Sequence, residues 1–165
     1  MAPAYDHELP ISGIHNLVTV LRDELEMDIQ PSGSTTLRRN LKESGAEPDD
    51  GFHIQHAADV IGHAKLDLRQ DPPPDIVVEV DRSNLSINKF AIYARMGVPE
   101  IWRLHDKTVK FHLLQGDVYQ ESPVSRAFPF LTSAILSQFV AQGLSEGERL
   151  AAKAFRQWLR ARPNA

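Results

Sequence analysis

Hydrophobic residues recur every three or four positions near the start of the chain, and charged side chains fill the positions between them. The apolar set is Ile14, Leu17, Val18, Leu21 and Leu25, and the charged set includes Arg22, Asp23, Glu24 and Glu26. This spacing predicts an amphipathic helix with one face on a core. Between residues 27 and 62 the pattern changes to short apolar runs separated by Pro, Gly and Asp, which predicts a small antiparallel sheet.

The clearest strand signal is the run DIVVEVD at residues 75–81. Side chains alternate between the two faces of a strand, so this run has one purely apolar face and one face with three acids. The apolar face holds Ile76, Val78 and Val80, and the other face holds Asp75, Val77, Glu79 and Asp81. The run is too apolar for a strand with one face in water, so it is predicted to be a central strand covered on both faces.

A helix and two further strands are predicted after this run. Ser83 or Asn84 can cap a helix over about residues 85–96, and Gly97 stands where a left-handed C-terminal stop belongs. The segments EIWRLH and TVKFHLLQ, at 100–105 and 108–115, have the composition of strands, and Gln115 with Gly116 predicts the following turn. Strand, helix and strand therefore follow in order.

The C-terminal part of the chain is predicted to be helical. Thr132 can cap a helix that Gly143 ends, and Ser145 with Glu148 matches a capping box for the last helix. The apolar positions of this last helix are expected to face inward, and they are Leu150, Ala151, Ala154, Phe155, Trp158 and Leu159.

The composition narrows the classes of function. A chain of 165 residues that is 42% hydrophobic can bury one core of ordinary size, so a single domain over residues 1–165 is expected. The chain has no cysteine, which excludes disulfides, thiolate zinc sites and cysteine nucleophiles and fits a reducing cytoplasm. No apolar run approaches the roughly 20 residues of a membrane span, so we expect no membrane partner. A net charge of −4 argues against a large non-specific nucleic-acid surface but allows a local basic groove or a metal-lined cleft.

Glu79 is the residue that most needs a chemical explanation, because burying an unpaired carboxylate costs several kcal/mol, roughly. On its own strand Asp75 lies about 13 Å away, and Asp81 lies about 6.6 Å away, at the limit of side-chain reach. A neighbouring strand is the better source of a partner. Asp49 in EPDDGFHI is the best candidate, because adjacent strands lie about 4.8 Å apart.

A pair of carboxylates at this spacing suits a hard divalent cation, which can orient an attacking water and neutralise charge on a phosphate. Lys89 completes the candidate site. It belongs to the row Leu85, Lys89, Ile92 and Met96, which has the spacing of a core-facing helical stripe. A lysine in that row needs a target for its ammonium group.

Simpler explanations exist for most of these residues. Asp49 fits equally well as a turn residue, and Lys89 can extend its alkyl stem along the core to reach water. Arg38 and Arg39 are weak candidates for contacts to a nucleic-acid backbone, and a hairpin turn with solvated arginines is favoured over this role. His53 and His56 in HIQH suggest metal ligation, but residues three apart on a strand face opposite sides, so zinc is not favoured.

Several segments together resemble the Uma-two family of bacterial candidate restriction endonucleases, within the PD-(D/E)XK nuclease superfamily. The segments are PSGSTTLRR, EPDDGFHI, LDLRQDPPPDIVVEVD, KFAIYARMGVPEIWRL and SRAFPFL. The resemblance implies the α/β (α+β) class, with a mixed β-sheet flanked by helices around a restriction-endonuclease-like core. Family members usually begin with a further segment of several tens of residues, so the expectation is that either the true start of this protein lies further upstream or its fold is trimmed.

The resemblance also assigns roles to individual positions. Asp49 matches the first metal-binding acid and Glu79 the second, with Mg²⁺ or Mn²⁺ as the implied ion. Asp81 stands where the superfamily usually has a lysine, and Lys89 matches the lysine that replaces it from the following helix. Asp75 matches a recurrent acid and is expected to support the site, as is Asp81.

The leading hypothesis is a magnesium-dependent endonuclease that hydrolyses phosphodiester bonds of nucleic acid, with DNA as the favoured substrate, through a metal-activated water. The main alternative is a catalytically silent module with the same fold that serves binding or dimerisation. A homodimer is a separate expectation. A sugar-binding or nucleotide-binding protein with an acidic pocket is the third interpretation.

Overall fold

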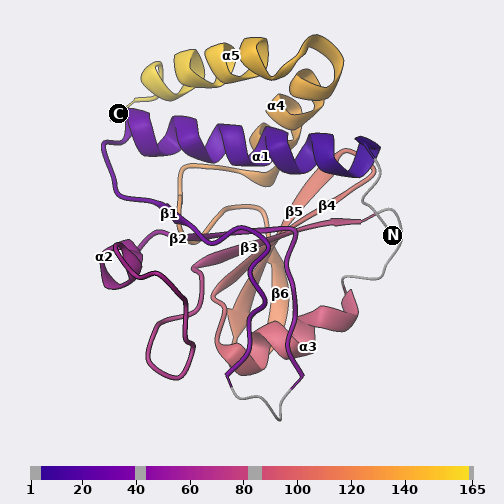
Figure 1. Cartoon of the computed structure of the whole chain (residues 1–165). Helices are drawn as coiled ribbons and strands as arrows, with labels where there is room; N and C mark the ends of the chain where they lie inside the picture. The colour runs from indigo at the N-terminus through magenta and orange to yellow at the C-terminus, as the bar shows by residue number, and fades with distance from the viewer. Residues whose placement is uncertain (1–4, 40–43, 82–86, 164–165) are drawn as a thin grey trace.

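A six-stranded mixed β-sheet forms the centre of the molecule (Figure 1). The computed structural model describes residues 5–39, 44–81 and 87–163. The strands lie side by side in the order of the sequence, and all neighbouring pairs are antiparallel except β3 with β4, which is parallel. They are β1 (Gln30–Pro31), β2 (Asp50–His53), β3 (Ile76–Asp81), β4 (Glu100–His105), β5 (Thr108–Gln115) and β6 (Val118–Ser122).

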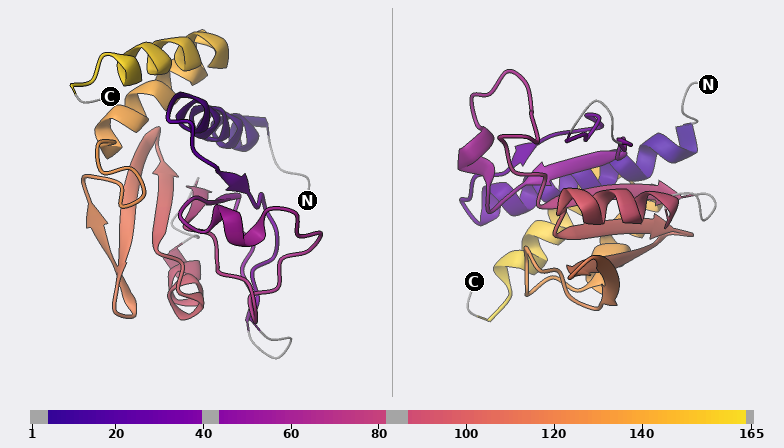
Figure 2. Two further views of the ribbon diagram at one scale, coloured as in Figure 1. Left: turned by 90° about the vertical axis from the view of Figure 1, so that its left-hand side faces the viewer. Right: turned by 90° about the horizontal axis from the view of Figure 1, so that it is seen from below.

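Helices cover both faces of this sheet. The helices α1 (Tyr5–Glu24), α4 (Ser133–Glu146) and α5 (Glu148–Arg160) pack together on one face, and α3 (Ile87–Met96) lies on the other (Figures 1 and 2). The short helix α2 (Ala57–Val60) lies beside β1 and β2. The α/β (α+β) class and the mixed sheet flanked by helices are therefore confirmed.

The two faces of β3 separate the two parts of the hydrophobic core. Ile76, Val78 and Val80 belong to the large core under α1, α4 and α5. Val77 belongs to a smaller core under α3, together with Tyr93 and Met96. The strand connects through α3 to its parallel neighbour β4, as a parallel pair requires. The prediction of a central strand covered on both faces is confirmed, and it places Glu79 on the α3 face.

The predicted sheet between residues 27 and 62 is only partly correct. Its strands β1 and β2 are short, and they belong to the one large sheet because β2 pairs with β3. Residues 57–60 are helical instead. The first helix begins at Tyr5, earlier than the apolar pattern indicates, and contains Pro10.

The predicted ends of the C-terminal helices were right at one position and wrong at two. Thr132 caps α4, and its side chain accepts a hydrogen bond from the amide of Ile135. Gly143 does not end α4, which continues to Glu146 and faces Ala151 of α5 at this glycine. The break falls at Gly147, whose φ of 97° is a conformation that favours glycine.

The predicted capping box is wrong for the same reason, since Ser145 lies inside α4 and Gly147 precedes α5. Leu150 is 39% exposed, so it does not face inward as predicted, whereas Ala151, Phe155 and Leu159 are buried. Gly97, with a φ of 77°, does follow α3 as predicted. The predicted cap at Ser83 or Asn84 lies outside the described residues. Within those residues, no helix combines the length and apolar character that a bilayer crossing requires.

Candidate metal and catalytic centre

The antiparallel pairing of β2 with β3 sets Asp49 opposite Glu79. Asp50 pairs with Val78 and Gly51 with Val77, so the next position of this register matches Asp49 with Glu79. The amide of Asp49 donates to the carbonyl of Val78 at 3.0 Å, one residue out of this register, so Asp49 lies just before β2 where the regular ladder ends. The two acids therefore lie on neighbouring chain segments and on the same face of the sheet.

Glu79 is held by side chains from α3. The Lys89 ammonium donates to both carboxylate oxygens, at 2.9 Å to Oε2 and 3.1 Å to Oε1, and the Tyr93 hydroxyl donates to Oε1. Lys89 also donates to the carbonyl of Glu47 at 2.8 Å. The ammonium thus has an acceptor for each of its three N–H groups. Two of these acceptors are the oxygens of the Glu79 carboxylate, which is only 2% exposed.

Burial raises the pKa of Glu79 to about 7, because the strand and α3 exclude water from the charged form. The hydrogen bonds from Tyr93 and Lys89, and the charge of Lys89, oppose this rise, while the negative charge of Asp49 adds to it. The pKa of Tyr93 is raised as well, first by burial and then by Glu79. Glu79 can therefore gain or lose a proton near neutral pH.

Asp49 is fixed by the backbone of β3. Its Oδ2 accepts a hydrogen bond from the amide of Val80 at 2.7 Å, and the imidazole Nε2 of His7 lies 3.6 Å from the same oxygen. His7 comes from the first turns of α1, and its Nε2 donates to the carbonyl of Val80 at 3.0 Å. Asp49 therefore takes part in a small polar cluster that connects α1, β3 and the segment before β2.

The neighbouring Asp50 has a different task. It points to the opposite face, where its Oδ2 lies 2.7 Å from Nδ1 of His15 on α1, and its Oδ1 accepts from the amide of Gly51 at 2.8 Å. Only 3% of Asp50 is exposed. Of the two aspartates in EPDDG, Asp49 is therefore the one on the side of Glu79.

Asp81 and Asp75 are engaged at the two ends of β3. Arg103 of β4 donates to Asp81 at 2.7 Å, so the acid at the usual lysine position is neutralised by a buried arginine. Asp75 accepts from the amides of Ile54 and His56, and it pairs with the His56 ring at 2.7 Å. These contacts tie Asp75 to the turn before α2, four residues along the strand from Glu79.

A cavity of about 400 Å³ opens beside Lys89. Thr36, Arg38, Glu47 and Lys89 line it, so an arginine and the lysine face the same open space. Arg39, which is exposed, instead donates to the carbonyl of Met96 at 3.4 Å. Of the two candidate arginines, Arg38 is the one that the structure brings to the site.

The donor atoms present fit a hard divalent cation with few protein ligands. The described residues contain no group of three or more acidic or histidine side chains arranged to hold a metal. An ionised carboxylate has about four acceptor positions, and Lys89 and Tyr93 occupy three on Glu79. Among the described residues no hydrogen bond to Oδ1 of Asp49 is found. Mg²⁺ is commonly held by one or two carboxylates and retains several waters, so Asp49 and Glu79 are ligands of a suitable kind.

Sequence reasoning missed two residues of this centre. Tyr93 lies four positions after Lys89, and i, i+4 spacing on a helix places it over the same surface, so that signal was available. His7 lies 73 residues from Val80 along the chain, and no local pattern indicates that α1 reaches this edge of the sheet.

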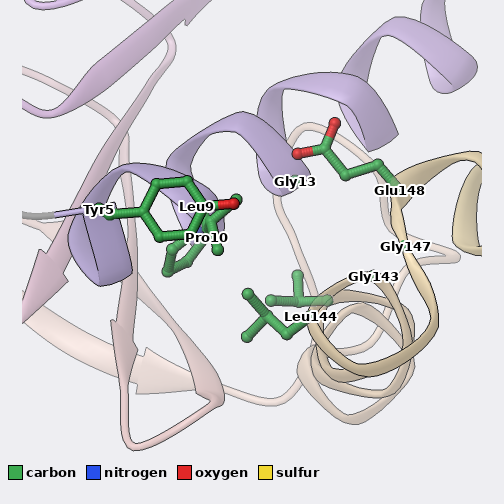
Figure 3. Close-up of a pocket in the computed structure, with 9 residues that line it drawn as sticks. Tyr5, Leu9, Pro10, Gly13, Gly143, Leu144, Gly147 and Glu148 are labelled. Atoms are coloured by element: carbon green, nitrogen blue, oxygen red, sulfur yellow. The ribbon is translucent and has the colours of Figure 1, made fainter.

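Another cavity, of about 290 Å³, lies between α1 and the turn from α4 to α5 (Figure 3). Tyr5, Pro10, Leu144 and Glu148 are among its lining residues, and three glycines complete it. These helices cover the face of the sheet opposite to Glu79, so this cavity is not part of the acidic centre.

A mixed sheet covered by helices, with acids on adjacent chain segments and a lysine from the following helix, defines a restriction-endonuclease-like protein. The chain belongs to the Uma2 family, described as "Putative restriction endonuclease", whose model matches residues 2–161. Among solved structures, one described as a putative nuclease from Anabaena variabilis has a TM-score of 0.54 and 14% sequence identity. The match covers 85% of this chain and 84% of that one, and at this identity it shows the fold. No curated protein matches the chain.

Proposed function

We propose that this protein is a magnesium-dependent endonuclease that hydrolyses phosphodiester bonds of DNA. The observation that supports this most strongly is the buried pair of Glu79 and Lys89 beside Asp49. Burying such a pair contributes little to stability, because the loss of hydration offsets much of the attraction. A titrating carboxylate with a specific charge partner beside a cavity is more typical of a functional site.

The roles of the three residues follow from their contacts. Asp49 and Glu79 would hold the cation, which when bound neutralises charge on the phosphate and lowers the pKa of the attacking water. Lys89 can exchange the Glu47 carbonyl for a phosphate oxygen, because the cavity that it lines is open beside its ammonium. There its positive charge would stabilise the negative charge that develops in the transition state.

The substrate is expected to enter along the cavity that contains Arg38. A guanidinium is well suited to a phosphate oxygen, and such contacts position a nucleic acid without reading its sequence. A cytoplasmic location is part of the proposal, since the chain contains no cysteine.

The direct test is cleavage of plasmid and oligonucleotide DNA with Mg²⁺ or Mn²⁺. We expect wild-type protein to cut and Glu79→Ala to lose activity, while Glu121→Ala, which removes an exposed glutamate from β6, keeps it. Absence of cleavage across substrates and both metals would overturn the enzymatic proposal.

The alternative is a catalytically silent module that keeps the fold for binding or dimerisation. Calorimetric titration with Mn²⁺ separates the two proposals, because an enzyme should give heat that Asp49→Ala and Glu79→Ala remove. A silent module should give no such heat. Sedimentation of the wild-type protein would show whether a dimer forms in either case.

A further inference from the structure

A third cavity lies next to β1 and β2, beside the segment that follows α2. Its volume is about 460 Å³, within the range of small-molecule sites. Gln30, Ser32 and His53, which are half-buried or buried, form its inner wall, and the exposed His63 and Lys65 form its outer part. Figure 1 shows α2 and the following loop beside these two strands.

Two buried polar atoms of this cavity have no hydrogen-bond partner among the described residues. They are Oγ of Ser32 and Nδ1 of His53, and only 1% of His53 is exposed. Ser32 lies against the bare Cα of Gly51, where a side chain would come within 2.5 Å of the hydroxyl. Buried polar groups are nearly always paired, so two unpaired ones in one cavity point to a polar ligand.

The protonation of His53 defines what this ligand must offer. The Nε2 of His53 lies 3.1 Å from the carbonyl of Pro72, so it bears the proton and donates. The pKa of His53 is lowered, chiefly because burial disfavours the charged ring. In the neutral ring Nδ1 is then an acceptor, which requires an N–H or O–H donor from the ligand.

The outer part of the cavity favours an anion. The ammonium of Lys65 is exposed there, and His63 lies beside it with its Nδ1 3.1 Å from Asp71. Asp49, Gly51 and His53 alternate onto one face of the sheet, so the cavity lies on the same face as the acidic centre. His53 comes four positions after Asp49, a distance of about 13 Å along an extended chain.

We propose that this cavity binds a nucleotide, with an amino group of the base donating to Nδ1 of His53 and the phosphate held near Lys65. Ser32 can donate to or accept from the base edge. The choice of a nucleotide among anions with an N–H donor rests on the proposed nuclease function. The exocyclic amino group of adenine is a suitable donor, so adenosine 5′-monophosphate is the first probe.

Calorimetric titration in buffer with a metal chelator tests binding independently of the metal centre. We expect adenosine 5′-monophosphate to bind, adenosine to bind more weakly, and the 5′-monophosphate of unsubstituted purine riboside, which lacks the amino group, to bind on the order of tenfold more weakly. Lys65→Glu should weaken the nucleotide on the order of tenfold and leave adenosine unchanged. Lys153→Glu makes the same charge change at an exposed position of α5 and should alter the affinity for neither the nucleotide nor adenosine.

Ser32→Ala should weaken both adenosine and its monophosphate, and near-ultraviolet circular dichroism would verify that the variant is folded. Absence of binding by all three probes, or equal affinity in wild type and Lys65→Glu, would overturn this inference. Glu79→Gln should bind the nucleotide as wild type does. DNA cleavage without nucleotide binding would remove the cavity proposal alone, and nucleotide binding without cleavage would remove the nuclease proposal alone.

Discussion

Two buried glutamates on adjacent strands, Glu79 of β3 and Glu100 of β4, have the same chemistry and opposite surroundings. They are 2% and 1% exposed, and burial is the largest cause of a raised pKa in both. Glu79 lies on the α3 face. Glu100 lies on the other face, because it is in register with Ile76.

The donors around each carboxylate explain the difference. Glu100 accepts from the indole of Trp102 at 2.8 Å and from the amides of Arg126 and Ala127 at 3.0 Å each. These contacts fix the loop before α4 to the sheet. Glu79 instead accepts from the side chains of Lys89 and Tyr93, lies near the charge of Asp49, and is bonded to a lysine that lines a cavity. A buried acid is therefore a candidate site only when its donors and neighbours leave room for a ligand.

The largest expected effect comes from removing the charge partner of Glu79. Lys89→Met keeps an unbranched apolar stem but removes the ammonium, so cleavage should fall on the order of 100-fold to 1,000-fold. Single-turnover cleavage at pH 8 measures this. Lys110→Met, which removes an exposed lysine paired with Glu121, is the matched control and should cut normally. Wild-type rates for Lys89→Met would remove Lys89 from the proposed mechanism.

The second largest expected effect is a dependence of the free energy of unfolding on pH. Because the pKa of Glu79 rises from 4.5 to about 7 on folding, its contribution is fully present below pH 4.5 and is lost as pH rises through 7. Over this window the loss is about 3 kcal/mol. Urea unfolding of wild type and Glu79→Gln measures it, and the difference between them should change by this amount. Parallel stability curves for the two proteins would contradict the raised pKa.

Sequence alone predicted the fold class and the position of Glu79, but it gave Glu100 no special place. Both acids lie in apolar runs. The donors to Glu79 follow 10 and 14 residues later on the next helix, and helical spacing can place them. The backbone donors to Glu100 lie 26 and 27 residues away in a loop, and no residue pattern encodes a loop amide.

The same limit applies elsewhere in the chain. The sequence indicated a helix end at Gly143, and the structure has the break four residues later at Gly147, where φ is 97°. The approach of His7 to Val80 depends on how a whole helix lies across the sheet. Local periodicity therefore predicts elements and faces, whereas contacts between distant segments require the structure.

Replacing Glu100 should change the free energy of unfolding and leave cleavage unchanged, unlike the replacement of Glu79. Glu100→Gln keeps the shape, but its amide group must face either the Trp102 indole or the two backbone amides, and all of these are donors. We expect a loss of about 2 kcal/mol in the free energy of unfolding and normal cleavage per folded molecule. At pH 8 Glu79→Gln should show the reverse, with no loss of stability and no cleavage. Loss of activity in folded Glu100→Gln would mean that both acids serve the centre.

The smallest expected effect distinguishes the Tyr93 hydroxyl, which donates to the titrating Glu79, from the Tyr119 hydroxyl, which donates to a backbone carbonyl. Tyr93→Phe removes the donor to Glu79, so the pKa of Glu79 should rise further, since this hydrogen bond lowers it. The variant should lose about 1 kcal/mol at pH 8, where Glu79 is charged, and less at pH 5, where Glu79 is protonated. Tyr119→Phe removes a hydroxyl that donates to the carbonyl of Val98 at 2.6 Å, and its loss should not depend on pH. Urea unfolding of both variants at the two pH values decides the matter, because equal losses for Tyr93→Phe at pH 5 and pH 8 would mean that its hydroxyl does not sense the charge on Glu79.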